Sequence, residues 1–246
     1  MSIFSKNPLT IKEIWITSLQ LYRKVFTQVW YLGMTIGIFV TVSLLFNVFY
    51  GTNDTSSFKV AHVILPIFIE LIALYLTSVI LYRIYNIAIE QAVSLKDSMI
   101  FINKKYFIIA SSMAVMFILS MLGTIAFILP GVFLIVLFAM GQPLILFDNQ
   151  GIIGAIKGSC KLVWGNWWRT FALIFPLLFI AYWMSFSMSR VAATTGKWYF
   201  FASGNMLFAV LFYPLITSCN LVIFNDLKLR RKIREITTTT TPTENL

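Results

Sequence analysis

The sequence predicts an all-α, polytopic membrane protein with six transmembrane helices and short in-plane amphipathic helices on the cytoplasmic side. Two observations carry this prediction. Apolar runs long enough to cross the roughly 30 Å hydrocarbon core of a bilayer occupy about residues 29–50, 61–86, 106–129, 131–147, 168–189 and 200–224. Basic residues also gather on one side of these runs once the N-terminus is placed in the cytoplasm, as the positive-inside bias of short loops requires.

The basic residues predict that both termini are cytoplasmic, because that placement puts 16 of the 19 Lys and Arg residues inside. Only Lys59, Arg190 and Lys197 then remain outside. Loops near 51–58, 130 and 190–198 are accordingly expected on the outer face. The inner set is Lys6, Lys12, Arg23, Lys24, Arg83, Lys96, Lys104, Lys105, Lys157, Lys161, Arg169, Lys228, Arg230, Arg231, Lys232 and Arg234.

Composition leaves no room for a soluble domain beside six spans. The chain has 246 residues, of which 59% are hydrophobic and 11% charged, so we expect one integral membrane domain over 1–235. The low-complexity polar end over 236–246 is expected to be a disordered cytoplasmic tail. The net charge of +10 is explained by topology, so we expect no nucleic-acid partner. Anionic membrane lipid at the cytoplasmic face is the expected partner, and no protein partner can be identified.

An in-plane helix is expected over about 9–28, ahead of the first span. Thr10 and Glu13 have capping-box spacing, in which each side chain bonds a free backbone N–H of the first turn. The apolar residues that follow recur at helical spacing, so one stripe can be buried at the headgroup boundary. Gly33 and Gly37 in the first span form a GxxxG pair, which we expect to pack within the chain.

Two further cytoplasmic segments predict in-plane helices, over about 95–104 and 152–166. Ser94 and Asp97 form the second capping pair. The third segment carries one apolar stripe and flanking lysines at 157 and 161. Each in-plane helix runs into an aromatic step and then a span, as expected at a membrane–water boundary.

Few residues offer chemistry. His62 is the only histidine, and no P-loop or G-x-S-x-G elbow occurs, so we expect no enzyme, no metal and no cofactor. Glu70 is the one acid well inside a span and is the candidate intramembrane polar site. It forms an interhelical hydrogen bond as a neutral acid, serves transport, or contacts a lipid headgroup if the span shifts outward. Asn47, Ser78, Thr217 and Asn220 are the polar residues that could line a pathway beside it.

A segment from Pro130 to Arg169 resembles the YciC family of uncharacterised multi-pass bacterial inner-membrane proteins. Pro130-Gly131 is expected to make a tight outer hairpin, and Gly141, Gln142 and Pro143 to kink or end the fourth span. The matching residues are Pro130, Gly131, Ala139, Pro143, Asp148, Gly151, Ile152, Ser159, Lys161, Leu162, Trp164 and Asn166. A looser likeness extends to membrane regions attached to some glycerophosphodiester phosphodiesterases. The family resemblance implies a bacterial inner (cytoplasmic) membrane location and no catalytic residue.

The sequence therefore predicts a non-enzymatic integral inner-membrane protein with a structural or lipid-related envelope role. The alternative is a small-molecule transporter or channel component. Further polar residues around Glu70 would favour this alternative.

Overall fold

The computed structural model describes residues 4, 7–50, 56–91 and 93–240, and all regular secondary structure within them is helical. The α-helices are α1 (Ile11–Tyr50), α2 (Ser56–Ala88), α3 (Leu95–Ala126), α4 (Ile128–Phe138), α5 (Gly141–Phe147), α6 (Ile152–Val163), α7 (Trp167–Thr195) and α8 (Trp198–Thr240). A short 3₁₀ turn, η1 (Trp164–Asn166), links α6 to α7.

Six helical segments are long and apolar enough to cross a membrane, and their number equals the number of spans predicted from the sequence. Two of the predicted in-plane helices are not separate elements, however. Residues 11–28 begin the continuous α1, and residues 95–104 begin the continuous α3. The six candidate segments are Ile11–Ser43, Ile64–Ala88, Leu95–Ala126, Ile128–Phe147, Ile152–Met188 and Tyr199–Thr237.

The predicted helix starts at α1 and α3 are confirmed by their capping bonds. Thr10 N–H donates to Glu13 Oε2 at 2.6 Å, and Glu13 N–H donates to Thr10 Oγ1 at 3.2 Å. At α3, Asp97 N–H donates to Ser94 Oγ at 3.1 Å. These bonds satisfy backbone donors that the first helical turn leaves unpaired. Each cap therefore fixes the residue at which its helix begins.

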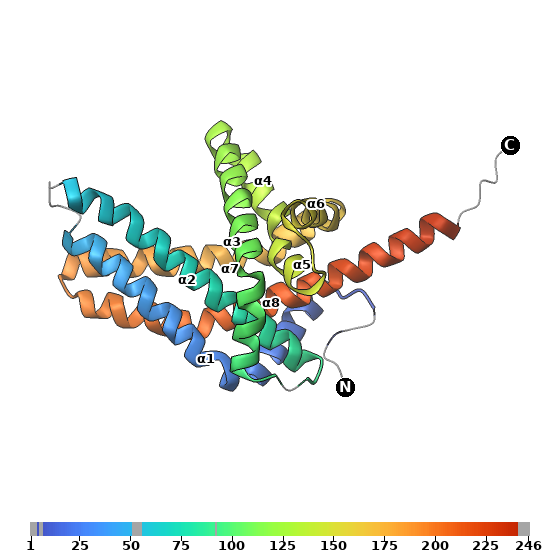
Figure 1. The fold of residues 1–246 in the computed structure, drawn as a ribbon, viewed down its shortest axis with the longest axis horizontal. Helices are drawn as coiled ribbons and strands as arrows, with labels where there is room; N and C mark the ends of the chain where they lie inside the picture. Colours follow the sequence, from blue (N-terminus) through green and yellow to red (C-terminus); the bar gives the residue numbers. More distant parts are fainter. Residues whose placement is uncertain (1–3, 5–6, 51–55, 92, 241–246) are drawn as a thin grey trace.

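Four long helices form the body of the molecule. Figure 1 shows α1, α2, α7 and α8 running lengthwise, with α1 and α8 side by side. The predicted glycine pair lies in that contact, because a Cβ on Gly33 would come within 3.0 Å of Ala209 O and one on Gly37 within 2.8 Å of Ala209 Cβ. The GxxxG motif thus serves packing within the chain, as predicted.

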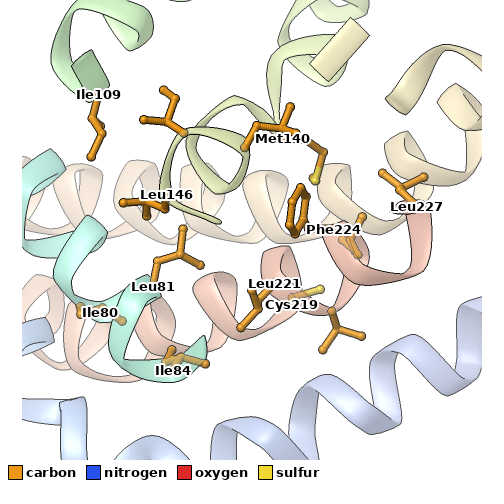
Figure 2. Close-up of a cluster of buried hydrophobic side chains, with 14 of the residues drawn as sticks. Ile80, Leu81, Ile84, Ile109, Met140, Leu146, Cys219, Leu221, Phe224 and Leu227 are labelled. Carbon is orange, nitrogen blue, oxygen red and sulfur yellow. The ribbon is translucent and has the colours of Figure 1, made fainter. Parts of the chain in front are cut away.

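The two ends of this body differ in charge. We call the end that holds Asp226 and the cationic residues of α8 the basic end, and the end that holds the α7–α8 turn at Gly196 the distal end. The hydrophobic core shown in Figure 2 joins α2, α3, α5 and α8 and contains Ile84, Ile109, Met140 and Leu221. This core fixes α3 and α5 against the body.

The α3–α4 hairpin lies across the body rather than along it (Figure 1). Its turn is at Phe127, the extended residue between the two helices, and Pro130 falls in the first turn of α4. A Cβ on Gly131 would come within 1.9 Å of Thr124 Oγ1. Gly131 therefore permits the close approach of α3 and α4, whereas we had expected it to form the turn itself.

The hairpin turn, which the sequence places with the outer loops, lies near Arg169. Leu129 and Pro130 share a cavity of about 850 Å³ with Trp164 and Arg169. No charged residue occurs between Lys105 and Asp148. The turn residues Phe127, Ile128 and Leu129 are 75%, 73% and 82% exposed. The exposed side chains of this turn are apolar, so none of them favours contact with water over contact with lipid.

Two other boundaries differ from the predictions. The predicted fourth span, 131–147, is broken between α4 and α5 at Ala139-Met140, just before the Gly141-Gln142-Pro143 step. Residues 236–240, expected to belong to a disordered tail, continue helix α8, and 241–246 lie outside the described residues. The amphipathic segment 152–166 is a separate element, α6 with η1, as predicted.

Candidate functional site

Glu70, the predicted intramembrane site, is exposed on the surface of α2. Within the described part of the chain it makes no hydrogen bond or ion pair, so the expected interhelical bond of a neutral acid is not formed there. The expected pathway residues also use their hydroxyls elsewhere. Ser78 donates to Leu74 O at 2.7 Å and accepts from Gln142 Nε2 at 2.8 Å, and Thr217 donates to Tyr213 O at 2.6 Å.

The remaining candidates add nothing to a pathway beside Glu70. Asn220 leaves a buried Oδ1 without a hydrogen-bond partner on α8. The side chains of Asn47 and His62 lie outside the described residues. Among the side chains that the structure describes, no hydrogen bond or ion pair joins these candidates to Glu70.

A buried carboxylate at the basic end organises a set of ionic contacts that we call the Asp226 cluster: Asp226, Arg169, Arg230 and the backbone of Leu9. Asp226 is 1% exposed. Its Oδ2 accepts from Arg230 Nε at 2.9 Å and from Arg169 Nε at 3.3 Å, and its Oδ1 accepts from Leu9 N–H at 2.7 Å. Both arginines also donate to Leu9 O.

This geometry joins three distant parts of the chain. Leu9 precedes α1, Arg169 lies in the first turn of α7, and Asp226 and Arg230 lie one turn apart on α8. A buried carboxylate is tolerated only when charge-assisted hydrogen bonds replace its lost hydration. The cluster therefore holds the chain entry, α7 and α8 together at the basic end, and every group in it is already engaged.

Two further contacts hold the connections at this end. Lys228 donates to Asp148 Oδ1 at 2.7 Å, which links α8 to the turn after α5. Lys105 donates to Leu146 O at 3.0 Å and to Asn149 Oδ1, which links α3 to the same turn. Both lysines therefore hold the connection after α5 against the helices of the basic end.

Ser159, one of the residues that resemble the YciC family, satisfies backbone groups at the break between α4 and α5. Its buried hydroxyl donates to Leu137 O at 2.6 Å and accepts from Met140 N–H at 3.2 Å. These are the backbone groups that an interrupted helix leaves unpaired. Pro143 lies just after the break, in the first turn of α5, where a missing N–H costs little.

The other motif residues lie around the cavity shared by α4 and the α6–α7 link. Trp164 is 67% exposed and packs edge-on against Phe133, and Asn166 O accepts from Thr170 Oγ1 at 3.0 Å. Lys161 is exposed on α6. Trp167, outside the motif set, donates Nε1–H to Phe133 O at 3.2 Å. The motif thus builds the joint between α4, α6 and α7, with Lys161 left free of the packing.

Helix α6 has three distinct faces. Ala155, Ser159 and Leu162 are buried against the body, Lys157 and Lys161 are exposed, and Ile153 is 67% exposed. A buried face, an exposed cationic stripe and a neighbouring exposed isoleucine suit a helix at the edge of a bilayer.

Sequence reasoning missed the Asp226 cluster because its bonds span up to 221 residues of separation. The available signal was local: Asp226 is the one acid in the run from Asn225 to Arg234, and Arg230 follows at i+4 spacing. That spacing favours an ion pair. Its partner Arg169 carries no such signal, since only the fold brings α7 to α8.

Neither a metal site in the described residues nor a matching known protein indicates a function for this chain. Within the described ranges, His, Cys, Asp and Glu side chains form no group of three that could hold a metal ion. No protein-family model, no curated protein and no solved structure matches this chain. The resemblance to the YciC family therefore stays a prediction.

Proposed function

We propose that this protein is a non-enzymatic integral protein of a bacterial inner membrane, with a structural or lipid-related role exercised through anionic lipid bound at its basic end. The observation that carries the proposal is the pairing of six apolar helical segments with exposed cationic side chains, most of which lie at the basic end. Both termini would then face the cytoplasm.

Two exposed lysines take no part in the ionic contacts that hold the basic end together. Arg169, Arg230, Lys105 and Lys228 already contact carboxylates or carbonyls. Lys157 and Lys161 on α6 are exposed, and the exposed Trp164 and Trp168 follow them in the sequence. Lysines near an anionic surface contribute about 1 kcal/mol each, and tryptophan favours the headgroup layer.

The transporter alternative has less support. Glu70 is exposed rather than directed into the body, and the hydroxyls of Ser78 and Thr217 bond to backbone groups of their own helices. A transport site would need polar groups that converge on the substrate from several helices.

Native mass spectrometry of the purified full chain in mixed phosphatidylglycerol and phosphatidylcholine micelles tests the proposal. We expect preferential retention of phosphatidylglycerol by the wild type. A Lys157→Gln, Lys161→Gln double variant should bind it more weakly, by up to about 30-fold at about 1 kcal/mol per lysine.

The matched control removes two exposed cations from the distal end, by Arg190→Gln and Lys197→Gln. It should retain phosphatidylglycerol as the wild type does. Equal loss in the two double variants would mean that net charge alone sets the affinity, and absence of any preference in the wild type would overturn the proposal.

A further inference from the structure

A second polar feature lies at the basic end, apart from the Asp226 cluster. A pocket of about 660 Å³ opens where α1, the end of α2 and the connection to α3 meet. Its polar lining includes Lys24 and Gln28 from α1, Arg83 and Asn86 from α2, and Glu90 and Gln91 from the connection. No part of the proposed lipid contact on α6 uses these residues.

Arg83 is the unusual member of this lining. Its Nε and Nη1 atoms are buried and have no hydrogen-bond partner. A guanidinium stays protonated in proteins, so it cannot escape the cost of burial by losing its charge. Leaving charged donors unpaired in a buried position costs more than leaving neutral ones. By contrast, the buried carboxylate of Asp226 has three donors.

The charge around Arg83 favours an anion. Lys24 adds a second cation from α1, Gln28 and Gln91 offer amide donors, and Glu90 is the carboxylate in the lining. Two cations against one carboxylate leave the lining with a net positive charge. Lys24, Gln28 and Gln91 are exposed, and Lys24 interacts electrostatically with Glu90 across the lining. An exposed side chain can turn toward a bound group.

The depth of Arg83 suits a headgroup phosphate. Arg83 lies five residues before Ala88, the last residue of α2, which is about 8 Å along the helix axis at 1.5 Å per residue. A lipid phosphate at the end of the helix could therefore reach the guanidinium from the open side of the pocket. Phosphate oxygens accept several charge-assisted hydrogen bonds at once, and arginine is well suited to supply them.

We propose that this pocket is a phosphate-binding site, in which Arg83 donates to the phosphate oxygens and Lys24 neutralises the remaining charge. The phosphate belongs either to a phospholipid headgroup or to a small soluble phosphate. The lipid form deepens and rests on the proposed function, whereas the soluble form does not.

Thermal unfolding of the full chain in a neutral detergent, at fixed ionic strength, tests the site with three probes. These are dioctanoyl phosphatidic acid, inorganic phosphate, and dioctanoylglycerol as the lipid without phosphate. We expect a saturable rise in Tm with phosphatidic acid and none with dioctanoylglycerol. A rise with inorganic phosphate at similar concentrations would assign the site to soluble phosphate, and its absence would assign it to lipid.

Arg83→Gln should raise the half-saturating concentration about tenfold, the loss expected for a charge-assisted bond. Without ligand this variant should be at least as stable as the wild type, because it removes two buried donors of a charged group that have no partner. A purely structural arginine would give the opposite result. Lys24→Gln, at an exposed position, should weaken the response by a smaller factor, and Arg23→Gln is the matched control outside the lining.

An unchanged response in Arg83→Gln, or an equal change in Arg23→Gln, would overturn the phosphate site. Native mass spectrometry separates this failure from failure of the proposed function. Arg83→Gln should keep the general preference for phosphatidylglycerol that depends on Lys157 and Lys161, while the Lys157→Gln, Lys161→Gln variant should keep the saturable response to phosphatidic acid.

Discussion

Replacing Asp226 with asparagine should destabilise the protein strongly, because the carboxylate is the only acidic member of the Asp226 cluster. The side chain keeps its volume but loses the charge that pairs with Arg169 and Arg230. Removing one partner of a buried ion pair costs about 3–5 kcal/mol. The side chains of Arg169 and Arg230 are 19% and 27% exposed, so water can reach them and we expect the lower bound, about 3 kcal/mol.

The assay is unfolding of the purified protein by sodium dodecyl sulfate in mixed micelles, followed by helical circular dichroism. Asp148→Asn is the matched control, because it makes the same substitution in a more exposed ion pair. The side chain of Asp148 is 25% exposed and that of its partner Lys228 is 46% exposed. Such a pair contributes about 1 kcal/mol or less. If Asp226→Asn lowers the unfolding free energy no more than Asp148→Asn does, the Asp226 cluster does not hold the basic end together.

Three other expectations follow from the packing. Ser159→Ala should lower the unfolding free energy by about 1–3 kcal/mol, since Leu137 O and Met140 N–H lose their buried partner; an effect as small as that of Ser203→Ala, whose exposed hydroxyl bonds only within α8, would contradict it. Ile128→Cys in intact membranes should resist a membrane-impermeant maleimide from either side, because the α3–α4 turn is apolar; labelling as fast as at Thr195→Cys, at the distal end, would show that this turn reaches water. Glu70→Gln should change stability by less than about 0.5 kcal/mol, as expected for an exposed side chain without partners; a larger loss would restore Glu70 as a structural site.

Local signals in the sequence predicted the local features of the fold. The six apolar runs, the caps at Thr10 and Ser94, and the glycine pair at Gly33 and Gly37 are each contained in one continuous stretch of the sequence. Such signals need no knowledge of the tertiary structure. All of these features were therefore predictable, and the structure confirms them.

Helix direction and continuity were not predictable in the same way. An amphipathic stretch such as 95–104 has the same periodicity whether it ends at the membrane surface or continues into a longer helix, as α3 does. The hairpin 106–147 begins and ends on the same side under either geometry. The positive-inside bias therefore cannot distinguish a hairpin that crosses the membrane from one that lies across the body.

The polar groups that matter most at the basic end were also hidden in the sequence. Arg83 and Arg169 both counted as cytoplasmic charges, but the first leaves donors unpaired in a pocket and the second pairs with Asp226. The difference depends on which helices surround each guanidinium. Only tertiary contacts between distant segments supply that information.

Membrane insertion with the basic end in the cytoplasm is the central claim, and alkaline-phosphatase fusions test it most directly in a bacterial host. The enzyme is active only when it is exported. Fusions after Asn53, between α1 and α2 in the sequence, and after Ala193, near the α7–α8 turn, should be active. Fusions after Lys96 and Asn166, at the basic end, should be inactive at equal protein level. Active fusions at Lys96 or Asn166, or inactive ones at Asn53 and Ala193, would contradict the claim.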